Sequence, residues 1–419
     1  MSSSILRLSF CFVLLAGLAG CGGTSISGSS GSGGSPTIVT YTFSGNNMPV
    51  AVATQIGAGA YTQATLTSGT LTLSIPNGET NYSVAWLCTA FINQVHSENI
   101  NQASILDGTA FSEACPPSPS LGGLTTVQVN ATAIPGAEGI FIGDQGCSVC
   151  NTFKLSGGLG VGTYDVPVYV TGTAGTNEAI AARILRDQTI PGALNGGAPV
   201  VFQTTDETVQ QTITYNNVPN GYSPVGGNVT YYTADGTFVP LALGSIPAAT
   251  QYMAMPSGTY QSGDYYYFAV GASPATGLEG VSVTRYTSSA GPQSFTFPAP
   301  LSYAGPTPAA LPTFNFAYSG FSGMSNVSQQ AGLSWSLGQV ALGNLDLDFI
   351  NVTATSNYQN GSTSISIPDL SSLTGFLAPA SSGTTVSWNA AVVQGDPFLT
   401  TPPSGTIQEV VNSGTYTEP

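Results

Sequence analysis

Short runs in which apolar and polar residues alternate recur along most of the chain. Val, Ile, Thr and Tyr fill these runs and Gly, Pro and Asn bound them, which is the pattern of half-buried β-strands. The clearest runs are TIVTYTF (37–43), TLTLSI (70–75), NYSVAWL (81–87), VPVYVTG (166–172) and DYYYFAV (264–270). Many short strands at spacings of about 8–12 residues are typical of β-sandwiches, so the sequence predicts an all-β chain.

Two further segments refine this prediction. NVTYYTADGTFVPL (228–241) predicts a hairpin that turns at Asp235 and Gly236. NEAIAARILRD (177–187) is the one segment whose pattern fits a helix, and it fits a pair of strands equally well. Helices therefore contribute little to the expected fold.

One sequence plan occurs three times, and a weaker version of it follows once. Each copy has an apolar residue, Pro, a small or polar residue and Gly, and then a variable turn that leads to a strand bearing Tyr. The copies are residues 73–86, 217–232 and 254–270, and the weaker one is 364–392. This plan resembles the corner before the penultimate strand of fibronectin type III and related immunoglobulin-like domains. The resemblance implies tandem immunoglobulin-like β-sandwiches, with Tyr82 capping the first corner.

Composition indicates where the modules begin and end. PAPLSYAGPTPAALP (298–312) holds five prolines and predicts a stiff linker. A second boundary is expected near KLSGGLGVG (154–162). The expected parts are a signal peptide (1–20), a Gly/Ser-rich tether (21–36), a disulfide-containing sandwich (37–155), a second sandwich (156–300), a Pro-rich linker (301–312) and a third, fibronectin type III-like sandwich (313–419).

The N-terminus has the features of a secretion signal. Arg7 precedes a short apolar run, and small residues lead to Cys21. The sequence Leu18-Ala19-Gly20-Cys21 resembles the lipobox of bacterial lipoproteins. That resemblance implies that the Cys21 thiol is linked to diacylglycerol, that the leader is cut before it, and that the new N-terminus is acylated, for example with palmitate. Gly22, in place of Asp, favours the outer membrane among such proteins. The alternative is a free cysteine after an ordinary signal peptide.

The lipid anchor sets the expected location. Two or three acyl chains on one residue hold a protein to a bilayer, whereas a single chain does so only marginally. The Gly/Ser-rich stretch behind Cys21 then spans roughly 20 Å as a flexible coil. We therefore expect a protein attached to the bacterial cell envelope, at the outer membrane or the cell surface.

The charge balance excludes one class of partner. The chain has 20 acidic and 5 basic residues, and removal of Arg7 with the leader lowers the formal net charge from −15 to −16. Phosphate binding needs clustered Lys and Arg, so nucleic acid is excluded as a partner. At 42% hydrophobic residues the chain can nevertheless build sizeable cores.

Four cysteines remain after the leader and the anchor are set aside: Cys88, Cys115, Cys147 and Cys150. An even number in an exported protein indicates disulfides, and four cysteines allow three pairings. Short loop closure favours Cys88–Cys115 and Cys147–Cys150. Two alternatives stay open. A zinc site could combine these cysteines with His96, and the pair Cys147 and Cys150 could serve an envelope thiol–disulfide protein, although the βαβ context of thioredoxin-like motifs is missing.

Few residues offer catalytic chemistry. His96 is the single histidine, and the sequence contains no GxSxG, HExxH or P-loop motif. We expect His96 to lie in an exposed loop without a Ser, Cys or carboxylate partner. Asp346 and Asp348 could be the two catalytic carboxylates of a glycosidase, or they could bind calcium. We expect both instead to face water on a strand whose leucines and Phe349 face the core.

Other polar and aromatic residues have two interpretations. Asp206 and Glu207 predict a solvated turn, and Arg183 and Arg186 predict local ion pairs. Trp335 and Trp388 lie in strand patterns typical of sandwich cores. In Tyr231-Tyr232 and Tyr265-Tyr266-Tyr267, alternate side chains point to opposite faces of a strand, so about half belong to the core. Tyr265 and Tyr267 are therefore the candidates for a ligand platform on the outer face.

The sequence favours a membrane-anchored surface lipoprotein that binds or displays and does not catalyse, with a glycan or an envelope protein as its ligand and with no cofactor or metal. One alternative is a secreted polysaccharide-binding or polysaccharide-active protein that uses Asp346 and Asp348. The other alternative is the envelope thiol–disulfide protein.

Overall fold

The structure of the protein is a computed structural model that describes residues 35–44, 47–90, 95–115, 125–143, 145–156, 159, 161–172, 179–241, 250–275, 278–339, 345–395 and 403–419. Nearly all regular structure in these residues is β-strand, so the predicted all-β fold of tandem sandwiches is confirmed. Cys21 and most of the tether lie outside the described residues. No helix in the described residues is long and apolar enough to cross a membrane.

The chain divides into two compact units that are not consecutive in sequence. Unit 1 contains Met1–Pro119, Leu301–Leu399 and Val410–Pro419, and unit 2 contains Ser120–Pro300 and Thr400–Glu409. Segments from both ends of the chain therefore share unit 1. Each unit holds two sandwich modules, which are numbered 1 to 4 along the chain.

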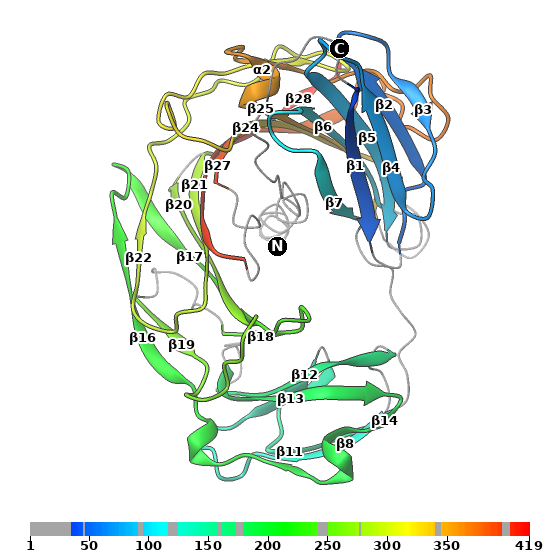
Figure 1. Cartoon of the computed structure of the whole chain (residues 1–419). Helices are drawn as coiled ribbons and strands as arrows, with labels where there is room; N and C mark the ends of the chain where they lie inside the picture. Colours follow the sequence, from blue (N-terminus) through cyan, green and yellow to red (C-terminus); the bar gives the residue numbers. More distant parts are fainter. Residues whose placement is uncertain are drawn as a thin grey trace. The chain divides into compact units, whose positions relative to one another are not determined.

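Module 1 belongs to unit 1 and is a sandwich of two sheets (Figure 1). Its strands are β1 (Thr37–Ser44), β2 (Ala51–Ile56), β3 (Thr62–Ala64), β4 (Thr70–Ile75), β5 (Asn81–Ala90), β6 (Val95–Ser104) and β7 (Ala110–Ala114). One sheet has the order β4-β1-β7, with β1 antiparallel to β4 and parallel to β7. The other sheet contains β3-β2-β5-β6.

Alternation in the strands of module 1 builds its core. Tyr41 in β1 and Tyr82 in β5 are fully buried, and Phe111 in β7 is 3% exposed. The ring centroids of Tyr41 and Phe111 are 4.7 Å apart, and those of Tyr41 and Tyr82 are 6.4 Å apart. The two sheets therefore meet through an aromatic cluster that includes the predicted corner tyrosine, Tyr82.

Module 4, also in unit 1, extends the second sheet of module 1. Its elements are β23 (Thr313–Asn315), β24 (Val327–Gln339), β25 (Leu345–Thr355), α2 (Ser356–Gln359), β26 (Ser364–Ser366), β27 (Thr385–Gln394) and β28 (Gly405–Thr417), whose residues from Val410 onward belong to this unit. Strand β25 pairs in parallel with β6, and β24 lies between β25 and β27. The core of module 4 contains both expected tryptophans, Trp335 (4% exposed) and Trp388 (7%).

The Pro-rich segment 301–312 packs against module 4. Leu301 is 1% exposed, and the ring of Tyr303 lies 5.3 Å from Phe316 and 5.6 Å from Trp388. The Tyr303 carbonyl also accepts a hydrogen bond from Asn412 (2.8 Å). The segment that the sequence predicts as a linker thus contributes to the core of a module.

Module 2 belongs to unit 2. Its elements are β8 (Thr125–Asn130), β9 (Gly139–Ile142), β10 (Gln145–Cys147), β11 (Thr152–Ser156), β12 (Gly162–Thr171), β13 (Ala179–Ile190), β14 (Gly192–Ala193), a 3-10 turn (Leu194–Gly197), β15 (Val200–Val201) and a second 3-10 turn (Thr204–Asp206). One continuous core runs from Val127 to Phe202. The boundary expected near residue 155 therefore lies inside this module. The segment 177–187, which fits a helix or two strands, is a single strand over its described residues.

Module 3 also belongs to unit 2. Its strands are β16 (Val209–Asn216), β17 (Tyr222–Tyr232), β18 (Phe238–Pro240), β19 (Gln251–Ala254), β20 (Tyr265–Pro274), β21 (Gly280–Thr287) and β22 (Gln293–Thr296). The predicted hairpin at Asp235 and Gly236 is the connection between β17 and β18. The opening strands β1, β8 and β16 of modules 1 to 3 share one arrangement, with an antiparallel neighbour on one side and a parallel neighbour on the other.

Candidate ligand-binding face

The tyrosines of module 3 divide between the two faces of one sheet. Tyr231 in β17 and Tyr266 in β20 are 0% and 2% exposed and belong to the core. Tyr232, Tyr265 and Tyr267 are only partly buried. Since neighbouring side chains in a strand point in opposite directions, these three lie on the outer face. The alternation expected from the sequence is therefore present.

Five rings gather on this outer face, and we call them the aromatic face: Tyr232, Phe238, Tyr265, Tyr267 and Tyr286. Tyr232 stacks on Tyr265 with centroids 5.1 Å apart and meets Phe238 at 5.7 Å. Tyr267 contacts Tyr286 edge to face at 5.4 Å. Phe238 is the most open of the five, at 51% exposed, and Tyr286 is the most covered, at 8%.

The hydroxyl groups of the aromatic face remain protonated at neutral pH. Burial raises the pKa of Tyr265 to about 12, and the neighbouring Tyr232 adds to the effect. Burial also raises the pKa values of Tyr232 and Tyr267. The face therefore combines apolar ring surface with neutral hydroxyls that donate and accept hydrogen bonds, the combination that makes tyrosine frequent in binding surfaces.

Module 2 carries a smaller aromatic pair at the corresponding strands. Phe141 in β9 and Tyr169 in β12 are paired across the sheet, and their rings stack at 5.2 Å. Their neighbours Ile140, Ile142 and Val168 are fully buried, so this pair lies on the opposite face of the sheet, where Tyr169 is 8% exposed. Sequence reasoning missed this pair, together with Phe238 and Tyr286, because single aromatic residues in alternating strands do not reveal which strands will be neighbours.

His96 and Asp348 contradict two expectations from the sequence. Nδ1 of His96 lies 2.9 Å from Oδ1 of Asp348, and their side chains are 23% and 6% exposed. His96 therefore has a carboxylate partner, and Asp348 does not face water. The side chain of Asp346 lies outside the described residues, so its expected exposure, and the carboxylate pair of the polysaccharide-active alternative, stay untested.

The phase of β25 explains this error. Ile350 and Val352 are 2% and 0% exposed, and Asp348 shares their side of the strand. The expectation took its phase from Leu345, Leu347 and Phe349 at the start of the strand. The rest of the strand sets the opposite phase, and a shift of one residue exchanges the two faces of a strand.

A second carboxylate lies on the buried sheet face that carries Asp348. Glu98 in β6 is 1% exposed, and its Oε2 accepts a hydrogen bond from the backbone N–H of Leu377 (3.1 Å). Burial raises the pKa of Glu98 to about 7, an effect that the Leu377 hydrogen bond opposes and that Asp369 and Asp348 reinforce. The parallel pairing of β6 with β25 thus brings Glu98, His96 and Asp348 onto one sheet face.

Arg186 is the centre of a charged network in unit 2. Its guanidinium donates to Asp165 (2.7 Å), to Asp264 (2.6 Å) and to the Thr259 carbonyl (2.8 Å). The fully buried Asp264 also accepts from the Tyr231 hydroxyl. Burial opposes ionisation of Asp264, but the hydrogen bonds from Arg186 and Tyr231 hold its pKa below the usual value.

The second arginine of β13 pairs more loosely. Nε of Arg183 lies 3.6 Å from Asp206, and its side chain is 43% exposed. Both arginines form ion pairs as expected, but Asp264, a partner of Arg186, comes from module 3 and is not local in sequence. In the described residues, no three His, Cys, Asp or Glu side chains gather in a way that would hold a metal ion.

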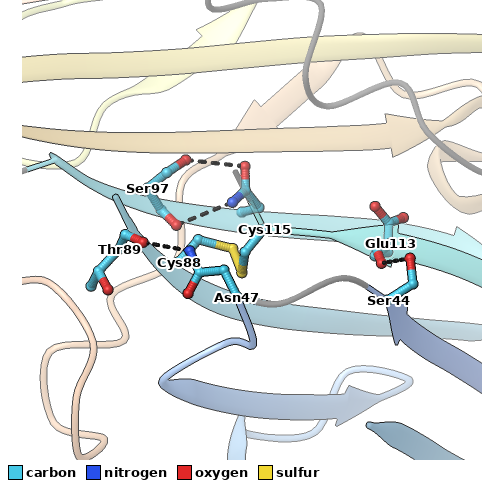
Figure 2. Close-up of a disulfide and its surroundings, with 8 residues drawn as sticks. Ser44, Asn47, Cys88, Thr89, Ser97, Glu113 and Cys115 are labelled. Carbon is cyan, nitrogen blue, oxygen red and sulfur yellow. Dashed lines mark hydrogen bonds between the residues drawn. A yellow bond between two sulfur atoms is a disulfide. The ribbon is translucent and has the colours of Figure 1, made fainter. Parts of the chain in front are cut away.

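The disulfide Cys88–Cys115 joins the two sheets of module 1, as Figure 2 shows. Both cysteines are buried, at 2% and 5% exposed. Asn47 donates to the Thr89 carbonyl beside the bridge (2.7 Å), and the buried Glu113 lies two residues before Cys115. The predicted pairing of these cysteines is confirmed, and Cys147 and Cys150 form the second pair.

Comparisons with known proteins do not assign a family. No family model matches the chain, and no curated protein matches it. A solved structure described as the tetra-tandem repeat in the extending region of a large adhesion protein is 12% identical, and the match covers 92% of this chain and 99% of that one with a TM-score of 0.14. So low a TM-score carries no structural or functional argument.

Proposed function

We propose that the protein is a lipid-anchored surface lipoprotein of the bacterial envelope whose β-sandwich modules present a carbohydrate-binding face. The observation that carries the binding role is the aromatic face of module 3. Flat apolar rings with hydroxyls at their rims suit a sugar, which offers apolar C–H faces and a rim of hydroxyl groups. No step of this proposal requires a catalytic residue or a cofactor.

The net negative charge of the chain limits the classes of polysaccharide that it is expected to bind. Of the four basic residues that the structure describes, Arg183 and Arg186 pair with carboxylates and Arg285 contacts the Phe295 ring and Gln293, which leaves Lys154 as an exposed cation. A strongly acidic protein repels anionic polymers at low ionic strength. Neutral polysaccharides are therefore the proposed ligands, with a protein of the envelope as the competing outcome of the test.

Affinity electrophoresis through gels that contain neutral or acidic polysaccharides tests the binding role. We expect neutral polysaccharides to retard the protein, and Phe238→Ala or Tyr265→Ala to remove at least about tenfold of the affinity, as loss of a central aromatic contact does. Met324→Ala, an exposed apolar residue of module 4 (49% exposed), is the control. Equal retardation of all variants would mean that the polysaccharide does not bind at the aromatic face. If the protein binds an envelope protein and no polysaccharide, the ligand is a protein and the proposed ligand class is wrong.

Membrane fractionation tests the anchor independently. Cys21→Ala should move the protein from the detergent phase to the aqueous phase, because the lipid is the membrane signal that the sequence indicates. Retention of this variant in membranes would overturn the lipoprotein assignment without affecting the binding role of module 3.

A further inference from the structure

The two cysteine pairs differ in how open they are to attack. Cys88 and Cys115 are buried between the sheets of module 1. Cys147 and Cys150 lie at the turn between β10 and β11, and both are only partly buried. Val149, between them, is 79% exposed. Because thiol–disulfide exchange requires a thiolate to reach a sulfur atom, the second pair is open to exchange in the folded protein and the first is not.

Backbone contacts hold Cys147 and Cys150 in place independently of their disulfide bond. The N–H of Cys150 donates to the Glu138 carbonyl, and Cys147 pairs with Ile140 across β10 and β9. Cys150 also packs against the core of module 2. These backbone contacts on both sides of the turn do not include the sulfur–sulfur bond, so we expect module 2 to stay folded when the pair is opened.

The same surroundings exclude a thioredoxin-like oxidoreductase. The pair is followed by the strand β11, whereas the reactive cysteine of such enzymes lies at a helix N-terminus, where the helix dipole lowers the thiol pKa. A cysteine pair in a turn between strands lacks a helix dipole that would lower its thiol pKa. It can therefore exchange only with reactive thiols supplied by another molecule.

We propose that Cys147 and Cys150 form a surface thiol–disulfide exchange site, whose co-reactant is a free thiol outside this protein. A thiolate of the co-reactant attacks one sulfur of the pair, which forms a mixed disulfide and releases the other sulfur as a thiolate. A second thiol then attacks the mixed disulfide. The products are two cysteine thiols and the disulfide of the co-reactant, with two electrons passed to the pair. This site is independent of the proposed carbohydrate-binding face.

Differential alkylation of the folded, full-length protein in detergent tests the site. The protein is incubated with reduced glutathione, quenched with an alkylating reagent, and each cysteine is followed by peptide mass spectrometry. We expect Cys147 and Cys150 to be labelled at least about tenfold faster than Cys88 and Cys115, because the buried pair Cys88–Cys115 is closed to thiols in the folded protein. The slower pair should be labelled only when denaturant is added.

A trapping variant provides a second measurement. Cys150→Ser leaves Cys147 without its partner, and we expect it to accumulate a mixed disulfide with one glutathione when oxidised glutathione is supplied. The matched control Val149→Ala keeps both cysteines and should react as the unaltered protein does. Equal labelling rates for all four cysteines, or protection of Cys147 and Cys150 until the protein unfolds, would overturn the proposal.

Discussion

The two units contain buried carboxylates in opposite electrostatic settings. In unit 2, the fully buried Asp264 is ionised, with Arg186 2.6 Å away and the Tyr231 hydroxyl as a further donor. In unit 1, Glu98 is equally buried but receives one backbone hydrogen bond, from Leu377. One carboxylate is therefore paired with a cation, whereas the other tends towards its neutral form.

The difference shows how a chain poor in cations accommodates buried acids. The cost of burying an unpaired charge is met either by a partner of opposite sign or by protonation. In unit 2 the arginine lowers the pKa of Asp264, and in unit 1 burial raises the pKa of Glu98 to about 7. The two solutions give opposite responses to pH and to mutation, which separates them experimentally.

The largest expected effect is at Arg186. Arg186→Met should lower the free energy of unfolding of unit 2 by about 3–5 kcal/mol, because it leaves Asp165 and Asp264 as buried carboxylates without their cation. Urea denaturation followed by tyrosine fluorescence measures the change. Arg183 lies in the same strand but is exposed, so Arg183→Met should lower the free energy of unfolding by only about 0–1 kcal/mol. Equal costs for the two variants would mean that the buried network does not stabilise unit 2.

The second effect is a pH dependence of opposite sign at Glu98 and at Asp264. The folded pKa of Glu98, about 7, exceeds the ordinary value of 4.5, so its contribution to stability is greatest below the ordinary pKa and is lost as pH rises towards 7. The loss is about 3 kcal/mol at 1.36 kcal/mol per pKa unit. Asp264, with a lowered pKa, loses its contribution as pH falls below about 4.

Glu98→Gln isolates this pH dependence. Unfolding by urea at pH 5 and at pH 8 should show that the variant has lost most of the decline between the two pH values, since the amide stays neutral. Glu79→Gln, on the exposed turn before β5, is the surface control. If Glu98→Gln keeps the full decline, then its source is another carboxylate whose pKa burial raises, Glu113 or Glu409.

The smallest effect concerns the pair His96–Asp348. Asp348→Asn keeps the size of the side chain and the hydrogen bond but removes the charge, so it should change the free energy of unfolding by about 1 kcal/mol or less. Thermal unfolding at pH 8, with Asp369→Asn as a more exposed control, measures it. A loss of more than about 3 kcal/mol would indicate that Asp348 is as essential to unit 1 as Arg186 is to unit 2.

Much of the local structure could be predicted from the sequence. In module 3, the strands within 228–241 and 264–270, the hairpin at Asp235 and Gly236 and the division of the tyrosines between two faces follow from the sequence pattern. The bridge Cys88–Cys115 follows from short loop closure. Such features depend on residues near one another in sequence, for which period and spacing are sufficient. The full aromatic face could not be predicted in this way, because Tyr286 and Phe238 join it only through the pairing of their strands with β20 and β17.

The sequence by itself therefore determined the sandwich class, several of the strands and which of the module 3 tyrosines face the core. Only the tertiary structure decided which distant strands are neighbours, such as β6 with β25, and through that pairing the burial of Asp348 beside His96. It also placed Tyr303, from an expected linker, against the core of module 4. The physical reason is that alternation fixes the two faces of a strand, whereas the partner and the buried face are chosen by the packing of the whole unit.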